Sequence, residues 1–153
     1  VAARGRDVRV VFDPPDGPAA AVGRGGADLV VRSRGGRNVL RPDAGPTVVA
    51  QPGEYEVRGV SCRGVAVEGG TAFVCDVDDI AVAAIGRGAG TLTEAALEAI
   101  GRVDVLVLPV GGGPGLTAAQ ASAAVARIEP ALVVPVGFAV GDELFGLEPG
   151  RAV

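Results

Sequence analysis

Apolar and polar positions alternate along much of the first 85 residues in the way that is typical of β-strands. Short runs rich in valine end at proline, glycine or asparagine, which remove hydrogen-bond donors from a sheet or favour turns. These runs predict strands at residues 8–12, 28–32 and 47–50, separated by loops at residues 16–26 and 33–38.

Between residues 54 and 85 the pattern is that of a meander. Alternation with period two over residues 57–65 is followed by a glycine turn, a returning apolar run and an aspartate turn. The pattern predicts three antiparallel strands joined by tight turns, at residues 57–65, 71–77 and 80–85.

The pattern changes to helical spacing after residue 90. Thr91 and Glu94 predict a capping box at the start of a helix that runs to Ile100, and Thr117 predicts the cap of a second helix at residues 118–128. The continuous apolar run at residues 103–109 is typical of a strand buried on both faces, and the fully apolar run at residues 131–136 predicts the last strand. Strands that alternate with helices predict an α/β fold in which right-handed crossovers place the helices on a sheet.

Size and composition indicate one soluble domain. The chain has 153 residues, 48% of them hydrophobic, enough to bury one core. No apolar run reaches the roughly 18 residues of a membrane span, and no signal peptide is recognisable, so we expect a cytoplasmic protein without a membrane partner. The chain has 14 arginines and 18 acidic residues, and the resulting net charge of −4 disfavours a nucleic-acid partner.

The chain contains no histidine and no lysine. Without histidine it has no side chain with an ordinary pKa near neutrality, no Ser-His or Cys-His dyad and no imidazole ligand for a metal. Without lysine it has no Schiff base and no phosphate-binding lysine of the Walker type. Many common enzyme mechanisms are therefore excluded. The cysteines, Cys62 and Cys75, are too few for a zinc site, and their apolar surroundings favour buried free thiols over a disulfide.

Two glycine loops lie between a strand and a helix, where backbone N–H groups can bind phosphate. The loop at residues 86–91 lacks the third glycine of the dinucleotide-binding motif, because Thr91 occupies that position. The loop at residues 111–115 has the same context. For both, a plain strand-to-helix turn is the alternative to an anion site.

Two clusters of charged residues are candidates for ligand binding. The acidic cluster at Asp76, Asp78 and Asp79 has no calcium-loop spacing, so we interpret it as a solvated turn. The arginine cluster lies near one loop and could receive a carboxylate or phosphate, or be solvated at the surface; its members are Arg32, Arg34, Arg37 and Arg41.

Several stretches together resemble the metallo-β-lactamase-fold hydrolases. The segment Gln51-Pro52-Gly53-Glu54-Tyr55-Glu56-Val57-Arg58-Gly59-Val60 is similar to the family's GPGEYEVxGV motif. Further similar stretches, in the same order, are residues 27–30, 103–112, 118–130 and 133–136. The resemblance implies an αββα sandwich, β-rich in its N-terminal part and β/α in its C-terminal part. It also implies a single domain over residues 1–153 that lacks the family's first strand pair.

The resemblance also implies where zinc ligands would stand, and this chain departs from every one of them. Arg34 and Gly36 stand at the first two histidines, Asn38 and Val39 at the Asp-His pair, Arg87 at the bridging aspartate and Gly137 at the last histidine. Guanidinium and glycine in place of imidazole and carboxylate remove the affinity for zinc, so we expect no metal and no cofactor. The cleft either accepts an anion or has collapsed; the candidate anion-binding residues are Arg34, Arg37, Asn38, Arg87, Gly112 and Gly137.

Three functions are compatible with these features. The first is a non-catalytic pseudo-hydrolase that acts as a binding or structural subunit, with a second copy or another protein at an exposed sheet edge. The second is a metal-independent hydrolase that uses Arg34, Arg37 or Arg87 as electrophile and Asp76 or Asp13 as base. The third is a binder of small anions or phosphate ligands that uses the arginines of the former metal cleft.

Overall fold

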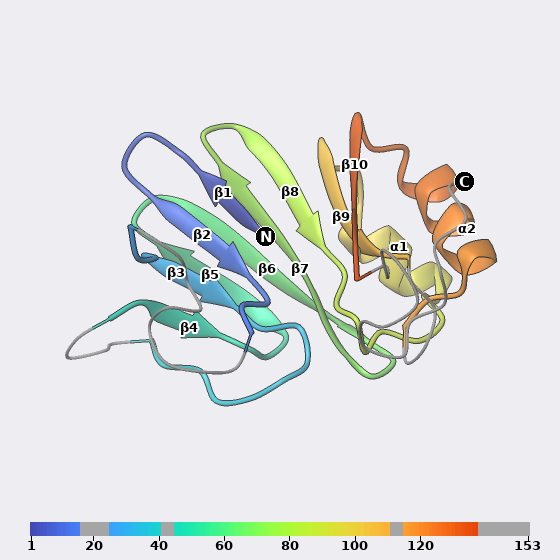
Figure 1. Ribbon diagram of the computed structural model, residues 1–153, viewed down its shortest axis with the longest axis horizontal. Helices are drawn as coiled ribbons and strands as arrows, with labels where there is room; N and C mark the ends of the chain where they lie inside the picture. Colours follow the sequence, from blue (N-terminus) through green and yellow to red (C-terminus); the bar gives the residue numbers. More distant parts are fainter. Residues whose placement is uncertain (16–24, 41–44, 111–114, 138–153) are drawn as a thin grey trace, which may run out of the picture.

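In the computed structural model, two β-sheets pack face to face and two helices cover the outer face of the second sheet (Figure 1). The structure describes residues 1–15, 25–40, 45–110 and 115–137. Within these residues the first sheet has the strand order β1-β2-β3-β4. Its strands are β1 (Ala2–Arg4), β2 (Arg9–Phe12), β3 (Leu29–Val31) and β4 (Thr47–Val49).

The second sheet has the order β10-β9-β8-β7-β6-β5. Strands β5 to β8 form the antiparallel meander, and β8, β9 and β10 run parallel to one another. Its strands are β5 (Gly53–Val57), β6 (Val60–Val67), β7 (Gly70–Val77), β8 (Ile80–Ala84), β9 (Val105–Pro109) and β10 (Leu132–Val136). The helices are α1 (Glu94–Ile100), between β8 and β9, and α2 (Ala118–Ile128), between β9 and β10.

Alternating side chains build two cores, one on each face of the second sheet. Phe12 and Leu29 of the first sheet pack against Phe73 and Val107 of the second sheet between the two sheets. On the other face of the second sheet, residues such as Leu106 pack against the buried faces of the helices. The predicted fold class is confirmed. Both described helices lie over the second sheet, so the described residues supply three of the four expected layers.

The sequence pattern did not predict two of the strands, β1 and β5. Strand β1 is Ala-Ala-Arg and contains no β-branched residue, yet it pairs antiparallel with β2. Strand β5 precedes a tight turn at Arg58 and Gly59, whose φ angles of 50° and 78° reverse the chain. The prediction of one strand over residues 57–65 was therefore wrong at its start, because Val57 ends β5 and Val60 begins β6.

The first helix begins later than its predicted cap. Thr93, not Thr91, is the N-cap of α1, and its hydroxyl accepts a hydrogen bond from the Ala96 N–H. The backbone N–H of Thr91 instead donates to the Glu68 carboxylate, and its hydroxyl accepts from the Gln120 side chain. These tertiary contacts keep residue 91 outside the helix. For α2 the predicted cap is confirmed, since Thr117 and Gln120 form a reciprocal capping box.

The two cysteines are buried as predicted, but they are bonded to each other and are not free. Cys62 of β6 and Cys75 of β7 face each other directly, with their Cα atoms 4.1 Å apart. The two-residue turn at Glu68 and Gly69 fixes this register, because a hairpin turn sets which residues stand opposite. The prediction of free thiols was wrong because it considered each apolar run without its partner strand.

Helices long and apolar enough to cross a membrane are absent from the described part of the chain.

Candidate functional site

Loops from both sheets meet around one polar cavity. Asp13 and Pro14 follow β2 and residues 32–35 follow β3, at the carboxyl ends of two neighbouring parallel strands of the first sheet, whereas Arg87 follows β8 of the second sheet. The cavity has a volume of about 430 Å³, and its described lining residues are Asp13, Pro14, Arg32, Arg34, Gly35 and Arg87. The expected convergence of Arg34 and Arg87 is thus present, with one arginine supplied by each sheet.

Ser33 fixes the loop that carries Arg34. Its backbone N–H donates to Asp13 Oδ1 at 2.7 Å, and its hydroxyl donates to Asp13 Oδ2 at 2.6 Å. Its carbonyl oxygen accepts from the Thr71 N–H at 2.8 Å, which connects the first sheet to the second. Sequence reasoning missed Ser33, because 20 residues separate it from Asp13 and no local motif links the two. Hydrogen bonds therefore hold this loop to Asp13, in a loop of the first sheet, and to Thr71 of the second sheet.

Close contacts with neighbouring backbone explain the glycines around Arg87. A Cβ at Gly86 would lie 1.7 Å from Ser33 Oγ, and one at Gly115 would lie 2.9 Å from the Arg87 carbonyl oxygen. A Cβ at Gly137 would lie 3.2 Å from Arg87 Nε, so the arginine side chain lies against this glycine. These contacts support the view of residues 86–91 as a packed strand-to-helix turn.

Two backbone N–H groups of the same loop already donate to Glu68. Glu68 Oε2 accepts from the Thr91 N–H at 3.2 Å, and the Glu68 carbonyl oxygen accepts from the Gly90 N–H at 2.8 Å. An anion at this turn would have to displace a carboxylate of the protein. The cavity with Arg34 and Arg87 is accordingly the better candidate.

In the described part of the chain, the guanidinium groups of Arg34 and Arg87 have no partner. Over residues 1–15, 25–40, 45–110 and 115–137, neither group has a hydrogen bond or an ion pair. Both side chains are exposed, so a ligand can approach them from solvent. Two unpaired guanidinium forks facing one cavity favour an anionic ligand, because each can donate two parallel hydrogen bonds.

The other predicted site residues lie elsewhere. Asn38 has a structural role: its amide nitrogen donates to the Tyr55 hydroxyl at 3.1 Å, and its amide oxygen accepts from the Ala50 N–H at 2.7 Å. Arg37 is exposed and is not among the described residues that line the cavity. Arg41 and Gly112 lie outside the described residues.

Four of the described lining residues were not among the predicted anion-binding set: Asp13, Pro14, Arg32 and Gly35. Arg32 belonged to the arginine cluster and Asp13 was named as a base, but neither was placed in the cleft. Gly35 was not named as a site residue at all. Position along the chain could have indicated two of them, because Asp13 and Arg32 directly follow β2 and β3, which are parallel neighbours.

The donor set does not suit the zinc that the resemblance implies. Arg34 and Arg87 are cationic, Gly36 and Gly137 offer no side chain, and the Asn38 amide oxygen already accepts from backbone. No group of three acidic, cysteine or histidine residues lies within metal-binding reach among the described residues. Positive charge at this place opposes a divalent cation.

Two residues of the acidic cluster, Asp78 and Asp79, form the turn between β7 and β8, and the third, Asp76, is exposed in β7. Asp78 and Asp79 have φ angles of 49° and 65°, which a two-residue hairpin turn requires. Asp78 Oδ2 accepts from the Arg6 N–H at 2.8 Å, and this contact joins the turn to the loop after β1. The arrangement supports the interpretation as a solvated turn.

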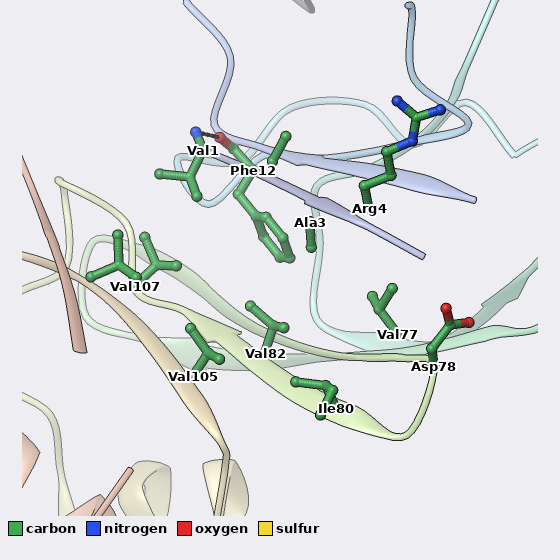
Figure 2. Close-up of a pocket in the computed structure, with 12 residues that line it drawn as sticks. Val1, Ala3, Arg4, Phe12, Val77, Asp78, Ile80, Val82, Val105 and Val107 are labelled. Carbon is green, nitrogen blue, oxygen red and sulfur yellow. Dashed lines mark hydrogen bonds between the residues drawn. The ribbon is translucent and has the colours of Figure 1, made fainter. Parts of the chain in front are cut away.

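A second cavity, of about 320 Å³, opens between the sheets at the side of β1. Figure 2 shows Phe12 and Ala3 of the first sheet directed toward Val82, Val105 and Val107 of the second sheet. The Arg4 guanidinium points away from this space, and the Asp78 carboxylate at its margin already accepts from the Arg6 N–H, so the described lining offers mainly apolar contact.

The comparisons agree with this architecture. The model of the β-lactamase superfamily domain family matches residues 2–137. A proposed zinc-dependent hydrolase of the metallo-β-lactamase superfamily from Thermotoga maritima has a TM-score of 0.76 and 26% sequence identity, over 97% of this chain and 76% of that chain. No curated protein sequence matches the chain.

Two more distant structures share the fold. A proposed metal-dependent hydrolase from Parabacteroides distasonis has a TM-score of 0.63 at 16% identity, over 92% of this chain and 78% of that chain. The metallo-β-lactamase fold protein YhfI from Bacillus subtilis has a TM-score of 0.65 at 10% identity, over 91% of this chain and 78% of that chain. Because the family model matches residues 2–137, which include Arg34 and Arg87, this chain belongs to the β-lactamase superfamily domain family; it is a member that contains no histidine.

Proposed function

We propose that the chain is a non-hydrolytic member of this family that binds a small anion, without a metal, between Arg34 and Arg87. The proposal depends on one observation: two guanidinium groups, on loops that follow strands of different sheets, line the same cavity and have no partner among the described residues. They stand at two positions where the resemblance implies metal ligands. Fixed positive charge thus takes the place of the charge of a metal ion.

The hydrolase alternative has less support in the geometry. Asp13, one of the two expected bases, already accepts a hydrogen bond from Ser33 on each carboxylate oxygen. Asp76, the other, stands opposite Ala81 near the start of β8, whereas Arg87 follows the end of that strand. Asp76 is therefore not among the described residues that line the arginine cavity, and the Asp13 carboxylate, which is, already accepts two hydrogen bonds from Ser33.

Thermal unfolding with and without sulfate tests the proposal. A ligand present at 100 times its Kd adds about 2.7 kcal/mol to the free energy of unfolding, so sulfate should raise the Tm of the full chain. The double variant Arg34→Ala, Arg87→Ala should lose this response. Arg102→Ala, which removes an exposed arginine outside the cavity, should keep it.

Three results would contradict the proposal. The Tm of the wild type does not respond to sulfate at any concentration, or the double variant responds as the wild type does. Alternatively, the purified chain retains one equivalent of zinc, manganese or iron after dialysis. Turnover of generic phosphodiester or ester substrates that disappears in the double variant would establish the hydrolase alternative instead.

A further inference from the structure

We infer that the ligand of the arginine cavity is the dianion of a phosphomonoester of a small polar molecule; this inference rests on the proposed function and specifies its ligand. Four properties of the described lining support this inference. They are the charge of its arginines, the placement of its hydrogen-bond donors, the size and polarity of the cavity, and the lack of a lining group that titrates near neutrality.

The charge of the lining matches a dianion. Among the described lining residues, Arg34 and Arg87 have no partner in the described part of the chain and supply two positive charges, whereas the Asp13 carboxylate already accepts hydrogen bonds from Ser33. Sulfate and a fully ionised phosphomonoester both carry two negative charges, whereas a monocarboxylate carries one. A phosphomonoester reaches a charge of −1.5 to −2 at pH 7 because its second pKa is about 6.

The placement of the donors favours a phosphoryl group over a carboxylate. Arg34 comes from the loop after β3 of the first sheet, and Arg87 from the loop after β8 of the second sheet. A single guanidinium fork already engages both oxygens of one carboxylate in a bidentate pair. A phosphomonoester has three terminal oxygens and can accept hydrogen bonds from both forks at once.

The size and polarity of the cavity restrict the remainder of the ligand. A volume of about 430 Å³ lies within the range of small-molecule sites and exceeds what an isolated phosphoryl group requires. The described lining contains no aromatic and no large aliphatic side chain. Nucleotide bases are bound by stacking and apolar contact, so a sugar or polyol phosphate fits this lining better than a nucleotide.

The ligand, and not the protein, sets the pH dependence of binding. The groups that face the cavity from its described loops are Asp13, Arg32, Arg34 and Arg87, and the chain has no histidine that would change charge between pH 5 and pH 8. With a second pKa of about 6, a phosphomonoester is roughly one-tenth dianion at pH 5 and almost wholly dianion at pH 7.5. Its affinity should therefore rise about tenfold over this interval, while that of sulfate, a dianion throughout, should not change.

Isothermal titration calorimetry of the full chain at pH 5.0 and pH 7.5 tests the inference, with ribose 5-phosphate, inorganic phosphate, sulfate, malonate and AMP as probes. We expect ribose 5-phosphate to bind most tightly at pH 7.5 and to weaken about tenfold at pH 5.0, and sulfate to bind equally at both. Arg34→Ala and Arg87→Ala should each weaken ribose 5-phosphate by roughly tenfold to a hundredfold, and Arg102→Ala should not. Circular dichroism of each variant verifies that it is folded.

The outcomes separate the inference from the proposed function. If no probe binds, or if the arginine variants bind as the wild type does, the anion-binding function itself is wrong. If sulfate binds in an arginine-dependent way but ribose 5-phosphate shows no gain between pH 5.0 and pH 7.5, the function stands and the phosphomonoester is wrong. Tighter binding of malonate, AMP or inorganic phosphate than of ribose 5-phosphate would likewise overturn the ligand class.

Discussion

At the scale of single residues, Gly86 illustrates how backbone packing positions the site. Gly86 is buried, and a Cβ there would overlap Ser33, whose hydroxyl and N–H are hydrogen-bonded to Asp13. Ser33 cannot move away without breaking those bonds. Because overpacking a well-packed site costs about 1–3 kcal/mol, Gly86→Ala should lower the free energy of unfolding by this amount and disturb the loop that carries Arg34.

Gly90→Ala is a matched control for that substitution. A Cβ at Gly90 would also be close to a side chain, but the nearest atoms are the carboxylate end of Glu68, which is exposed and can rotate away with the loss of only one hydrogen bond, that from the Thr91 N–H. Urea denaturation of the two variants should therefore show a clear loss of stability for Gly86→Ala and a much smaller one for Gly90→Ala. Equal stabilities of the two variants would show that Ser33 is not held as rigidly as its hydrogen bonds indicate.

Single residues also show what could be read from the sequence at the candidate site. Arg34 and Arg87 could be placed in one cleft because each follows a strand in a stretch that resembles the family. The hydrogen bonds between Asp13 and Ser33 could not be read, because they join side chains from two loops that no motif connects. Asn38 occupies a ligand position in the resemblance, but its partners Tyr55 and Ala50 are visible only in three dimensions.

At the scale of elements, strands with strong apolar patterns were predicted and weak ones were not. Strands β2, β3, β7 and β9 each contain buried β-branched residues, which the alternation or the continuous run reveals. Strand β1 lacks that signal, and the start of α1 depends on contacts of Thr91 with Glu68 and Gln120. Local pattern was thus sufficient wherever burial dominates, and insufficient where tertiary hydrogen bonds decide.

The disulfide between β6 and β7 gives a prediction at this scale. It closes a short loop, with a sequence separation of 13, and cross-links of about that length restrict the unfolded chain by roughly 3 kcal/mol. Reductant should lower the free energy of unfolding by about this amount in urea titrations. The double variant Cys62→Ala, Cys75→Ala should not respond to reductant.

Thiol titration provides an independent check of the disulfide. The denatured chain should release no thiol before reduction and two after it. Two titratable thiols in the denatured, unreduced protein would contradict the bond. Since disulfides are rare in cytoplasmic proteins, the same titration also tests the expected cytoplasmic location.

At the scale of the whole molecule, the edge strands of the two sheets differ in how well they are protected against pairing with a strand of another chain. Strand β10 contains Pro135, which cannot donate to an added strand, and β5 exposes the carboxylates of Glu54 and Glu56. Strand β4 is met by the bridge between Val39 and Val48. Among the described residues these features leave β1 as the edge with the least protection, so the expected partner surface, which stays a prediction, belongs there.

Hydrogen bonding within the β1–β2 pair allows this edge to be tested without unfolding the sheet. Val1 and Phe12 exchange hydrogen bonds, and the Gly5 N–H donates to the Val8 carbonyl oxygen, so the alternation of an antiparallel pair directs the Ala2 N–H outward. Ala2→Pro should remove that outward donor and leave the pairing with β2 intact. If a second copy adds at β1, sedimentation velocity should show a concentration-dependent dimer for the wild type and a monomer for Ala2→Pro at the same concentrations. A wild type that sediments as a monomer at every concentration, or a dimer that persists in the variant, would exclude β1 as the site where a second copy adds.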